Sequence, residues 1–244
     1  MKIVTNAERP DLQGSAQAHL RDGWPGFVLR DPVSNEHRAA VAEYFPRFDV
    51  LLLEDDDTVL ARATAVALRW AGRTEALPDG GYDGALIAAV AEHENGVQPD
   101  TLCVVAATVR SDRTGGGLAG KVLTALRERA EDAGLRRVAV PVRPTLKASY
   151  PLTSMADFQR WTREDGLHLD PWIRTHQRLG ATILAPAPRS MVVTGTVAQW
   201  EKWTGMAFPQ TGHYVVPGAL DLVEIDRERD QGRYEETNLW MRHR

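Results

Sequence analysis

A strand, a glycine-rich turn and a helix follow one another in the middle of the chain, and this order constrains the fold most. Residues 101–109 (TLCVVAATV) form an almost continuous apolar run, as expected for a strand buried on both faces. The turn RSDRTGGG follows, and apolar residues then recur every four positions from Leu118 to Ala130, which predicts one apolar face of a helix. Residues 138–142 (VAVPV) predict another strand, so the centre is a β-α-β unit of an α/β protein.

Segments before this unit predict further helices and strands. Ser34 and Pro46 flank a helical stretch, in which Ser34 can cap the first turn and Pro46 ends the run. Two apolar stretches around the acidic turn at 54–57 predict a β-hairpin. Asp83 is placed to cap a helix that runs to about Glu94. The chain therefore combines an antiparallel hairpin with the parallel central unit.

The segments after the unit continue this alternation. A capping box at Ser154 predicts a helix over 155–164. The pair Asp170-Pro171 predicts the N-cap and first position of a second helix, which stops at Gly180. The segments ATIL and SMVVTG then predict two strands, and a short helix follows Thr196.

The order of elements also predicts the domain organisation. We expect one α/β domain over residues 1–194, with its core at about 34–194 and a central mixed sheet flanked by helices. Residues 195–244 hold the β-like pieces HYVV, ALDLVEI and NLWM. They predict a β-rich C-terminal extension that packs on the same domain.

Composition excludes several classes of protein. The 244 residues are 43% hydrophobic and 25% charged, which excludes a disordered chain, and the net charge of −4 disfavours a nucleic-acid binder. Cys103 is the single cysteine, so neither an internal disulfide nor a cysteine-rich zinc module is expected, and we predict no metal. No apolar run reaches 18 residues and the first residues lack a signal-peptide core, so a cytoplasmic protein without membrane contact is expected. The excess of arginine over lysine is typical of a bacterium with GC-rich DNA.

The glycine turn RTGGGLAGKV allows three interpretations. It is a flexible surface turn, or a nucleotide-binding P-loop, or a site for the pyrophosphate of coenzyme A at a helix N-terminus. Gly115, Gly120 and Lys121 satisfy the P-loop spacing, but Val122 stands where the magnesium-binding serine or threonine belongs. Because free N–H groups and the helix dipole both attract phosphate, a turn between a buried strand and an amphipathic helix favours the third interpretation.

In this turn the chain resembles the GNAT superfamily of acyl-CoA-dependent N-acyltransferases. The GNAT motif Q/R-x-x-G-x-G/A follows a strand and opens a helix, and Thr114 replaces its first residue here while Arg113 stands one position earlier. The resemblance implies that the loop residues hold the pyrophosphate of acetyl-CoA. These are Arg113, Thr114, Gly115, Gly116, Gly117, Leu118 and Ala119.

The order of the remaining elements also resembles the GNAT fold. Helices, a hairpin, a strand, the loop, a helix, a strand, another helix and a final strand pair are reproduced over residues 34–194. In many members a tyrosine lies four residues before a Leu-Gly-Phe segment at the end of the late helix. Leu179 and Gly180 match that segment, whereas His176 replaces the tyrosine and Ala181 the phenylalanine.

The resemblance implies direct transfer of an acetyl group from the thioester to a neutral amine. Backbone N–H groups near Thr108 and Val109 are then expected to stabilise the charge on the carbonyl oxygen, in a slot between splayed strands. His176 or Tyr150 is expected to protonate the leaving thiolate. The strand at 101–109 holds no glutamate, aspartate or histidine, so the sequence identifies no general base.

Arg143 and Lys147 follow the fifth strand and are expected to bind a substrate carboxylate or a phosphate of coenzyme A. We expect the acceptor to be a small-molecule amine of specialised metabolism or detoxification, because the C-terminal segment can close the groove that protein substrates need open. A protein or peptide acetyltransferase and a non-catalytic acyl-CoA-binding regulator remain alternatives. Pairing through the late strands leaves a homodimer open.

Overall fold

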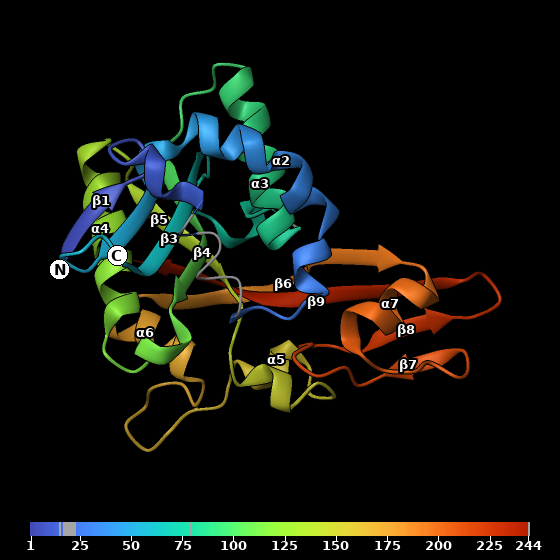
Figure 1. Ribbon diagram of the computed structural model, residues 1–244. Helices are drawn as coiled ribbons and strands as arrows, with labels where there is room; N and C mark the ends of the chain where they lie inside the picture. The colour runs from blue at the N-terminus through green and yellow to red at the C-terminus, as the bar shows by residue number, and fades with distance from the viewer. Residues whose placement is uncertain (15, 17–22, 79, 244) are drawn as a thin grey trace.

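The strands of the chain form one sheet in the computed structural model, which describes residues 1–14, 16, 23–78 and 80–243. The sheet has the order β1-β2-β3-β4-β5-β9-β8-β7, and β6 pairs with the other edge of β9 (Figure 1). The described strands are β1 (Lys2–Thr5), β2 (Asp49–Leu53), β3 (Val59–Leu68), β4 (Thr101–Val109), β5 (Arg137–Val142), β6 (Thr182–Gly195), β7 (Gly212–Tyr214), β8 (Val223–Asp226) and β9 (Gln231–His243).

Helices cover both faces of this sheet. The described α-helices are α2 (Pro32–Tyr44), α3 (Gly81–Glu94), α4 (Leu118–Asp132), α5 (Met155–Phe158), α6 (Pro171–Arg178) and α7 (Val197–Thr204). Side chains alternate between faces along β9, so Asn238 and His243 point to opposite sides. The Ser190 hydroxyl of β6 accepts a hydrogen bond from the Tyr82 N–H of α3 and donates one to Asn238. His243, in contrast, is hydrogen-bonded to His176 of α6. Helices α3 and α6 therefore lie on opposite faces (Figure 1).

Several helix ends differ from those that the sequence predicts. Helix α2 begins at Pro32, and Asp31 rather than Ser34 is its cap, since the Asp31 carboxylate accepts the Ser34 N–H at 2.7 Å. Helix α3 begins at Gly81, so Asp83 lies in its first turn and not at its cap. Helix α5 is capped by Ser154 as predicted but ends at Phe158, well before residue 164. The cap of α6 by Asp170 is confirmed.

The last part of the chain supplies the strand that completes the sheet. The two strands expected from ATIL and SMVVTG are one strand, β6, with a register irregularity between Ala187 and Met191. Strand β9 lies between β6 on one edge and both β5 and β8 on the other. The boundary expected after residue 194 therefore does not separate two sheets, because β9 comes from the segment expected to be an extension. The real insertion is the segment between β6 and β9, which carries α7, β7 and β8.

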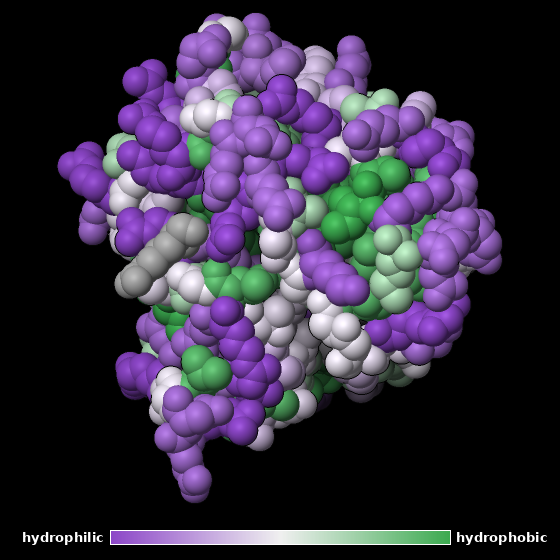
Figure 2. Space-filling model, turned by 90° about the vertical axis from the view of Figure 1, so that its left-hand side faces the viewer, coloured by the Kyte–Doolittle hydropathy of each residue, from purple (hydrophilic) through white to green (hydrophobic). Residues whose placement is uncertain are grey.

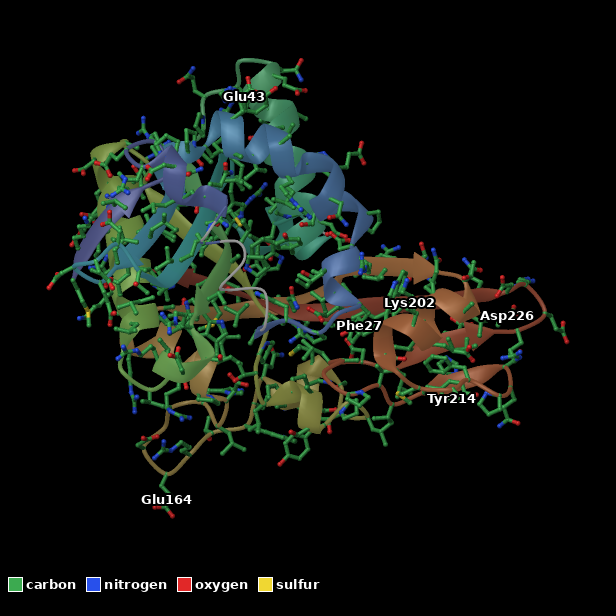
Figure 3. All side chains as sticks on the ribbon, in the orientation of Figure 1. Phe27, Glu43, Glu164, Lys202, Tyr214 and Asp226 are labelled. Atoms are coloured by element: carbon green, nitrogen blue, oxygen red, sulfur yellow. The ribbon has the colours of Figure 1, made fainter. Side chains whose placement is uncertain are left out.

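This insertion has a core of its own at the far end of the long β6–β9 pair (Figure 1). Trp200 of α7 is fully buried there and contacts Phe27, with ring centroids 5.6 Å apart. Phe27 lies beside the insertion (Figure 3), and its ring also meets Tyr234 of β9 edge-on at 5.3 Å. The segment before α2 therefore packs against the insertion through Phe27. Trp200 is a packing residue of the core of the insertion.

The hydrophilic surface and the buried cysteine are those expected from the composition. Seen from the side of β1 and α4, the surface is largely hydrophilic, and apolar side chains gather mainly in one recessed area (Figure 2). None of the described helices is both long and apolar enough to cross a membrane. Cys103 is fully buried, and burial raises the pKa of its thiol, so it is a core residue.

Candidate active site

A cavity of about 650 Å³ opens between β4 and β5. One end is lined by Ser111, Thr114 and Ala119 of the glycine turn and the start of α4. Its middle is lined by residues 104–109 of β4 and 140–142 of β5. The cavity then continues to polar side chains on the face that α2 and α3 cover, so it joins the turn to a buried polar site.

The cavity exists because β4 and β5 diverge. The two strands pair in parallel only from Thr101 to Cys103, opposite residues 137–139. Beyond that point they share no pairing, and the partly buried residues 105–109 of β4 line the gap. The register between β3 and β4 also shifts there, since Thr64 faces Ala106 and Ala65 faces Val104. The unpaired Val105 is therefore a β-bulge, which bends β4 at the mouth of the slot.

The glycine turn presents backbone N–H groups to this slot. Gly115 and Gly117 have φ values of +84° and +70°, a region that favours glycine over residues with a side chain. A Cβ on either residue would meet nothing within 4 Å, so backbone conformation and not crowding requires glycine. Gly117 is the N-cap of the 15-residue helix α4, and no side chain caps it. Unsatisfied N–H groups and the positive helix end therefore point at whatever binds there.

A buried ion pair forms the opposite end of the cavity. Arg143, which follows β5, donates from Nε to both carboxylate oxygens of Glu236, at 3.1 and 2.9 Å. Glu236 is fully buried in β9 and also accepts from Tyr234 and Asn238 at 2.8 Å. Burial alone would lower the pKa of Arg143, but the charge of Glu236 raises it. Arg143 therefore keeps its charge, and Glu236 already accepts four hydrogen bonds.

Trp24 contacts both β4 and Arg143 in the cavity. Its indole Nε1 donates to the Thr108 hydroxyl on β4 at 3.3 Å, and its ring lies 6.0 Å from the Arg143 guanidinium carbon. Both contacts hold the ring between β4 and Arg143. Trp24, Tyr82, Glu236 and Asn238 line the cavity, although the sequence indicated none of them. The three on β9 and the N-terminal segment escaped prediction because neither segment was expected to belong to the core.

Two further carboxyl groups lie behind the cavity wall formed by Ser34 and Tyr82. Asp31 and Asp83 are both buried and interact with each other and with Glu236. Burial, together with the charge of Asp31, raises the pKa of Asp83 to about 8. Asp83 therefore holds a proton at neutral pH and shares it with Asp31, while both accept backbone N–H groups.

His176 lines the cavity from the side of α6. Its ring is fully buried, and Nδ1 lies 2.9 Å from Nε2 of His243, at the end of β9. Nε2 of His176 has no hydrogen-bond partner within the described parts of the chain. Burial and the neighbouring His243 lower the pKa of His176 to about 3, and burial lowers that of His243 to about 4. Both rings are therefore neutral at pH 7.

Comparisons with known proteins agree with this geometry. No family model matches the chain. It is 28% identical to "Arginine N-acetyltransferase avaD" of Aspergillus versicolor over 271 aligned positions, which cover 99% of the chain and 93% of that relative. The loading GNATL domain of CurA from Lyngbya majuscula superposes with a TM-score of 0.58 at 14% identity, over 99% of the chain and 96% of that domain. The chain is therefore similar over its whole length to an N-acetyltransferase, and it has the fold of GNAT domains. The "GphF GNAT-like decarboxylase in complex with isobutyryl-CoA" shares the fold at 12% identity, with a TM-score of 0.51 over 100% of the chain and 98% of that protein.

These similarities agree with the resemblance to GNAT acyltransferases and confirm the mixed α/β fold that the sequence predicted. The expected splay of two strands at the slot is present, and the structure brings together several of the residues singled out from the sequence. Thr108, Val109, Thr114, Ala119, Arg143 and His176 all line the cavity. Arg113 is exposed beside the turn and pairs with Glu54 at 3.1 Å, so one cation next to the GNAT loop is already partly neutralised.

Two predicted residues lie away from the cavity. Tyr150 is 40% exposed and packs edge-on against Trp161 at 4.8 Å. Lys147 is fully buried, and its Nζ donates to the Tyr150 and Leu220 carbonyl oxygens and pairs with Asp221 at 3.6 Å. Burial lowers the pKa of Lys147, against the effect of Asp221. Both residues therefore hold the loop after β5 in place, and neither is among the side chains that line the cavity.

The side chains of His168 and Asp170 both bond to the backbone. His168 bonds the Phe158 carbonyl through Nε2 and accepts the Asp170 N–H through Nδ1. Asp170 in turn caps α6 and accepts the Leu146 N–H. Within residues 1–14, 16, 23–78 and 80–243, no group of three His, Cys, Asp or Glu side chains is arranged to hold a metal ion.

Proposed function

We propose that this protein transfers the acetyl group of acetyl-CoA to the primary amine of an arginine-like amino acid. The expectation of acyl-CoA-dependent N-acetyl transfer to an amine is confirmed by the full-length similarity to an arginine N-acetyltransferase. One structural observation carries the proposal: a single cavity joins the uncapped N-terminus of α4 to the buried Arg143–Glu236 pair.

The glycine turn and slot fit acetyl-CoA, which serves as the acyl donor. The N–H groups from Thr114 to Ala119 face an anion such as the pyrophosphate. The chain of amides and methylene groups that follows in the donor fits a slot with free strand edges and apolar walls. Backbone N–H groups of β4 between the bulge at Val105 and Val109 are then placed to donate to the thioester oxygen, which gains charge as the amine attacks.

The acceptor end fits a small amino acid. Arg143 is buried, and only its Nε and Nη2 donate to partners within the described chain, to Glu236 and to the Gly218 carbonyl. The two N–H groups of Nη1 and the second N–H of Nη2 are left to hold a substrate carboxylate. The guanidinium of an arginine-like acceptor stays protonated at all working pH values and is not a nucleophile. The α-amine is then the group that attacks, once it is neutral.

Release of the coenzyme A thiol with a matched set of amines tests the proposal. The amines are L-arginine, its decarboxylated amine, L-norleucine and an N-terminal arginine peptide. They test separately whether the acceptor's carboxylate and its guanidinium are recognised. We expect L-arginine to react fastest, the amine without the carboxylate to show a raised KM, and the peptide to be poor. Equal rates with the peptide would instead favour a protein acetyltransferase. Acetyl-CoA binding without turnover of any amine would favour a non-catalytic acyl-CoA-binding module.

Further measurements test the remaining expectations. Thermal stabilisation by acetyl-CoA but not by magnesium–ATP is expected, since a ligand at about 100 times its Kd adds roughly 2.7 kcal/mol to the free energy of unfolding. A homodimer, a cytoplasmic location and a role in specialised metabolism stay predictions. Sedimentation of the pure protein tests the first of these.

A further inference from the structure

The insertion between β6 and β9 reaches the acceptor end of the cavity through one short loop, residues 218–221, which lies between β7 and β8. In this loop the Gly218 carbonyl accepts from Nη2 of Arg143 at 2.6 Å. Glu236 of β9 accepts from Nε of the same guanidinium. The planar guanidinium is therefore held by two acceptors from different parts of the chain, a strand of the sheet and the insertion.

The 218–221 loop is joined to β9 by hydrogen bonds. The Leu220 N–H donates to the Tyr234 hydroxyl at 2.8 Å. The same hydroxyl donates to Glu236 at 2.8 Å. One tyrosine thus connects the two acceptors of Arg143, so a displacement of the loop would change how both of them meet the guanidinium.

Lys147 fixes the loop from another side. Its side chain is fully buried, and Nζ donates to the carbonyl oxygens of Leu220 and Tyr150. The Asp221 carboxylate lies 3.6 Å from Nζ and faces its charge. Because a buried ammonium is costly unless its donors and its charge are matched, the 218–221 loop cannot leave Lys147 without a large penalty.

The Gly218 carbonyl also has little freedom of its own. Gly218 has a φ of +84°, and a Cβ on it would lie 2.8 Å from Cγ of Pro25. The preceding residue, Trp24, places its ring 6.0 Å from the guanidinium carbon of Arg143. The guanidinium therefore lies among the Trp24 ring, the Gly218 carbonyl and the Glu236 carboxylate.

This arrangement leaves the Nη1 side of Arg143 open. Nη1 makes no hydrogen bond to the described residues, and it is not among the described polar atoms that lie buried without a partner. Because Arg143 lines the cavity, a ligand there can reach Nη1.

We propose that Lys147 is a positioning residue that, through the 218–221 loop, aims the free side of Arg143 at the carboxylate of the acceptor. The insertion then selects amines that carry a carboxylate. This inference rests on the proposed function. It also gives Lys147, which the sequence singled out as a substrate-binding residue, a role that acts through Arg143 and not by contact with the substrate.

The orientation of the guanidinium matters because a carboxylate is bound best by two parallel N–H groups in one plane. Glu236 bonds only Nε, so it does not prevent the two Nη groups from exchanging places by rotation about the Nε–Cζ bond. The Gly218 carbonyl, which bonds Nη2, does hinder that rotation. An amine without a carboxylate does not use these N–H groups, so its binding should not depend on the loop.

The mobility of the Arg143 guanidinium is measured first, because it does not depend on turnover. Nitrogen-15 NMR is expected to resolve separate Nη1 and Nη2 signals, which are assigned by their loss in Arg143→Lys. Lys147→Met is expected to merge them, whereas Lys202→Met, at an exposed position of α7, should not (Figure 3). Separate signals in folded Lys147→Met would overturn the proposal. If no amine reacts, the proposed function fails while this spectrum still decides whether Lys147 positions Arg143.

Kinetics then tests the selectivity. In Lys147→Met the KM for L-arginine is expected to rise about 10- to 100-fold, the range for loss of a hydrogen bond to a charged group. The KM for the decarboxylated amine and for acetyl-CoA should stay unchanged. Gly218→Ala keeps the lysine contacts and displaces the carbonyl, so the same pattern is expected if Lys147→Met does not fold. Gly212→Ala is its matched control and should be silent, since a Cβ there meets nothing within 4 Å.

The comparison of the two amines separates positioning from a general loosening of the site. If the KM values for L-arginine and for its decarboxylated amine rise equally in folded Lys147→Met and Gly218→Ala, the carboxylate plays no part and the proposal is refuted. An unchanged KM for L-arginine in both folded variants refutes it as well.

Discussion

Removal of the Glu236 carboxylate should destabilise the protein far more than removal of its neighbour on the same strand. Glu236 is fully buried, and only 17% of the Arg143 side chain is exposed. Glu236→Leu leaves a buried guanidinium without its counter-ion, and it also removes the acceptor of the Tyr234 and Asn238 donors. Breaking a buried ion pair from one side costs about 3–5 kcal/mol of unfolding free energy.

Urea unfolding followed by circular dichroism measures this cost. With a slope of about 3 kcal/mol per molar urea, the midpoint should fall by roughly 1–1.7 M. The control is Glu235→Leu, which removes an exposed pair with Arg233 on the adjacent position of β9. An exposed pair contributes only about 0.2–1 kcal/mol, so that midpoint should move by roughly 0.3 M or less.

The double variant Arg143→Met/Glu236→Leu tests whether the unpaired charge of Arg143 causes the loss of stability. Because the penalty comes from an unpaired buried charge and not from lost attraction, removal of both partners should restore at least about 2 kcal/mol relative to Glu236→Leu. A double variant no more stable than Glu236→Leu would refute the account. The double variant should also lose discrimination between L-arginine and its decarboxylated amine.

Three further predictions concern other parts of the molecule. Gly117→Ala forces a side chain to a φ of +70° and should cost about 1 kcal/mol in stability and weaken acetyl-CoA binding in calorimetry, whereas Gly120→Ala, inside α4, should stabilise and bind normally. Asp83 has a pKa of about 8 when folded and roughly 3.9 when unfolded, so the folded state holds the extra proton between these values and stability falls as pH rises toward 8, by up to about 1.4 kcal/mol per pH unit; Asp83→Asn should abolish that part of the pH dependence of the urea midpoint. Tyr150→Phe should leave kcat unchanged in the thiol-release assay, since the ring lies outside the cavity, and a loss above ten-fold would contradict that position.

The central unit was predictable because each of its signals is local. The buried strand, the glycines with positive φ and the apolar face of α4 are read within 30 consecutive residues, and they place one end of the cavity. His176 was found for a related reason, since it occupies a fixed position in a short segment before Gly180. The helix cap at Asp31 was missed because Asp31-Pro32 and Ser34 are both good start signals, and only packing against α3 decides between them.

The acceptor end was not predictable because its parts meet only through the topology. Glu236, Asn238 and His243 come from a segment that the sequence predicted only as part of a β-rich extension, with polar and apolar residues in alternation. That alternation acquires its meaning only once β9 inserts between β5 and β6, which sends the even-numbered residues toward Arg143 and the odd-numbered ones toward His176. A one-residue slip of β9 would exchange the two sets, so that Glu236 would leave Arg143 and His243 would leave His176. The register of this one strand therefore sets both the ion pair at the acceptor end and the contact between the two histidines.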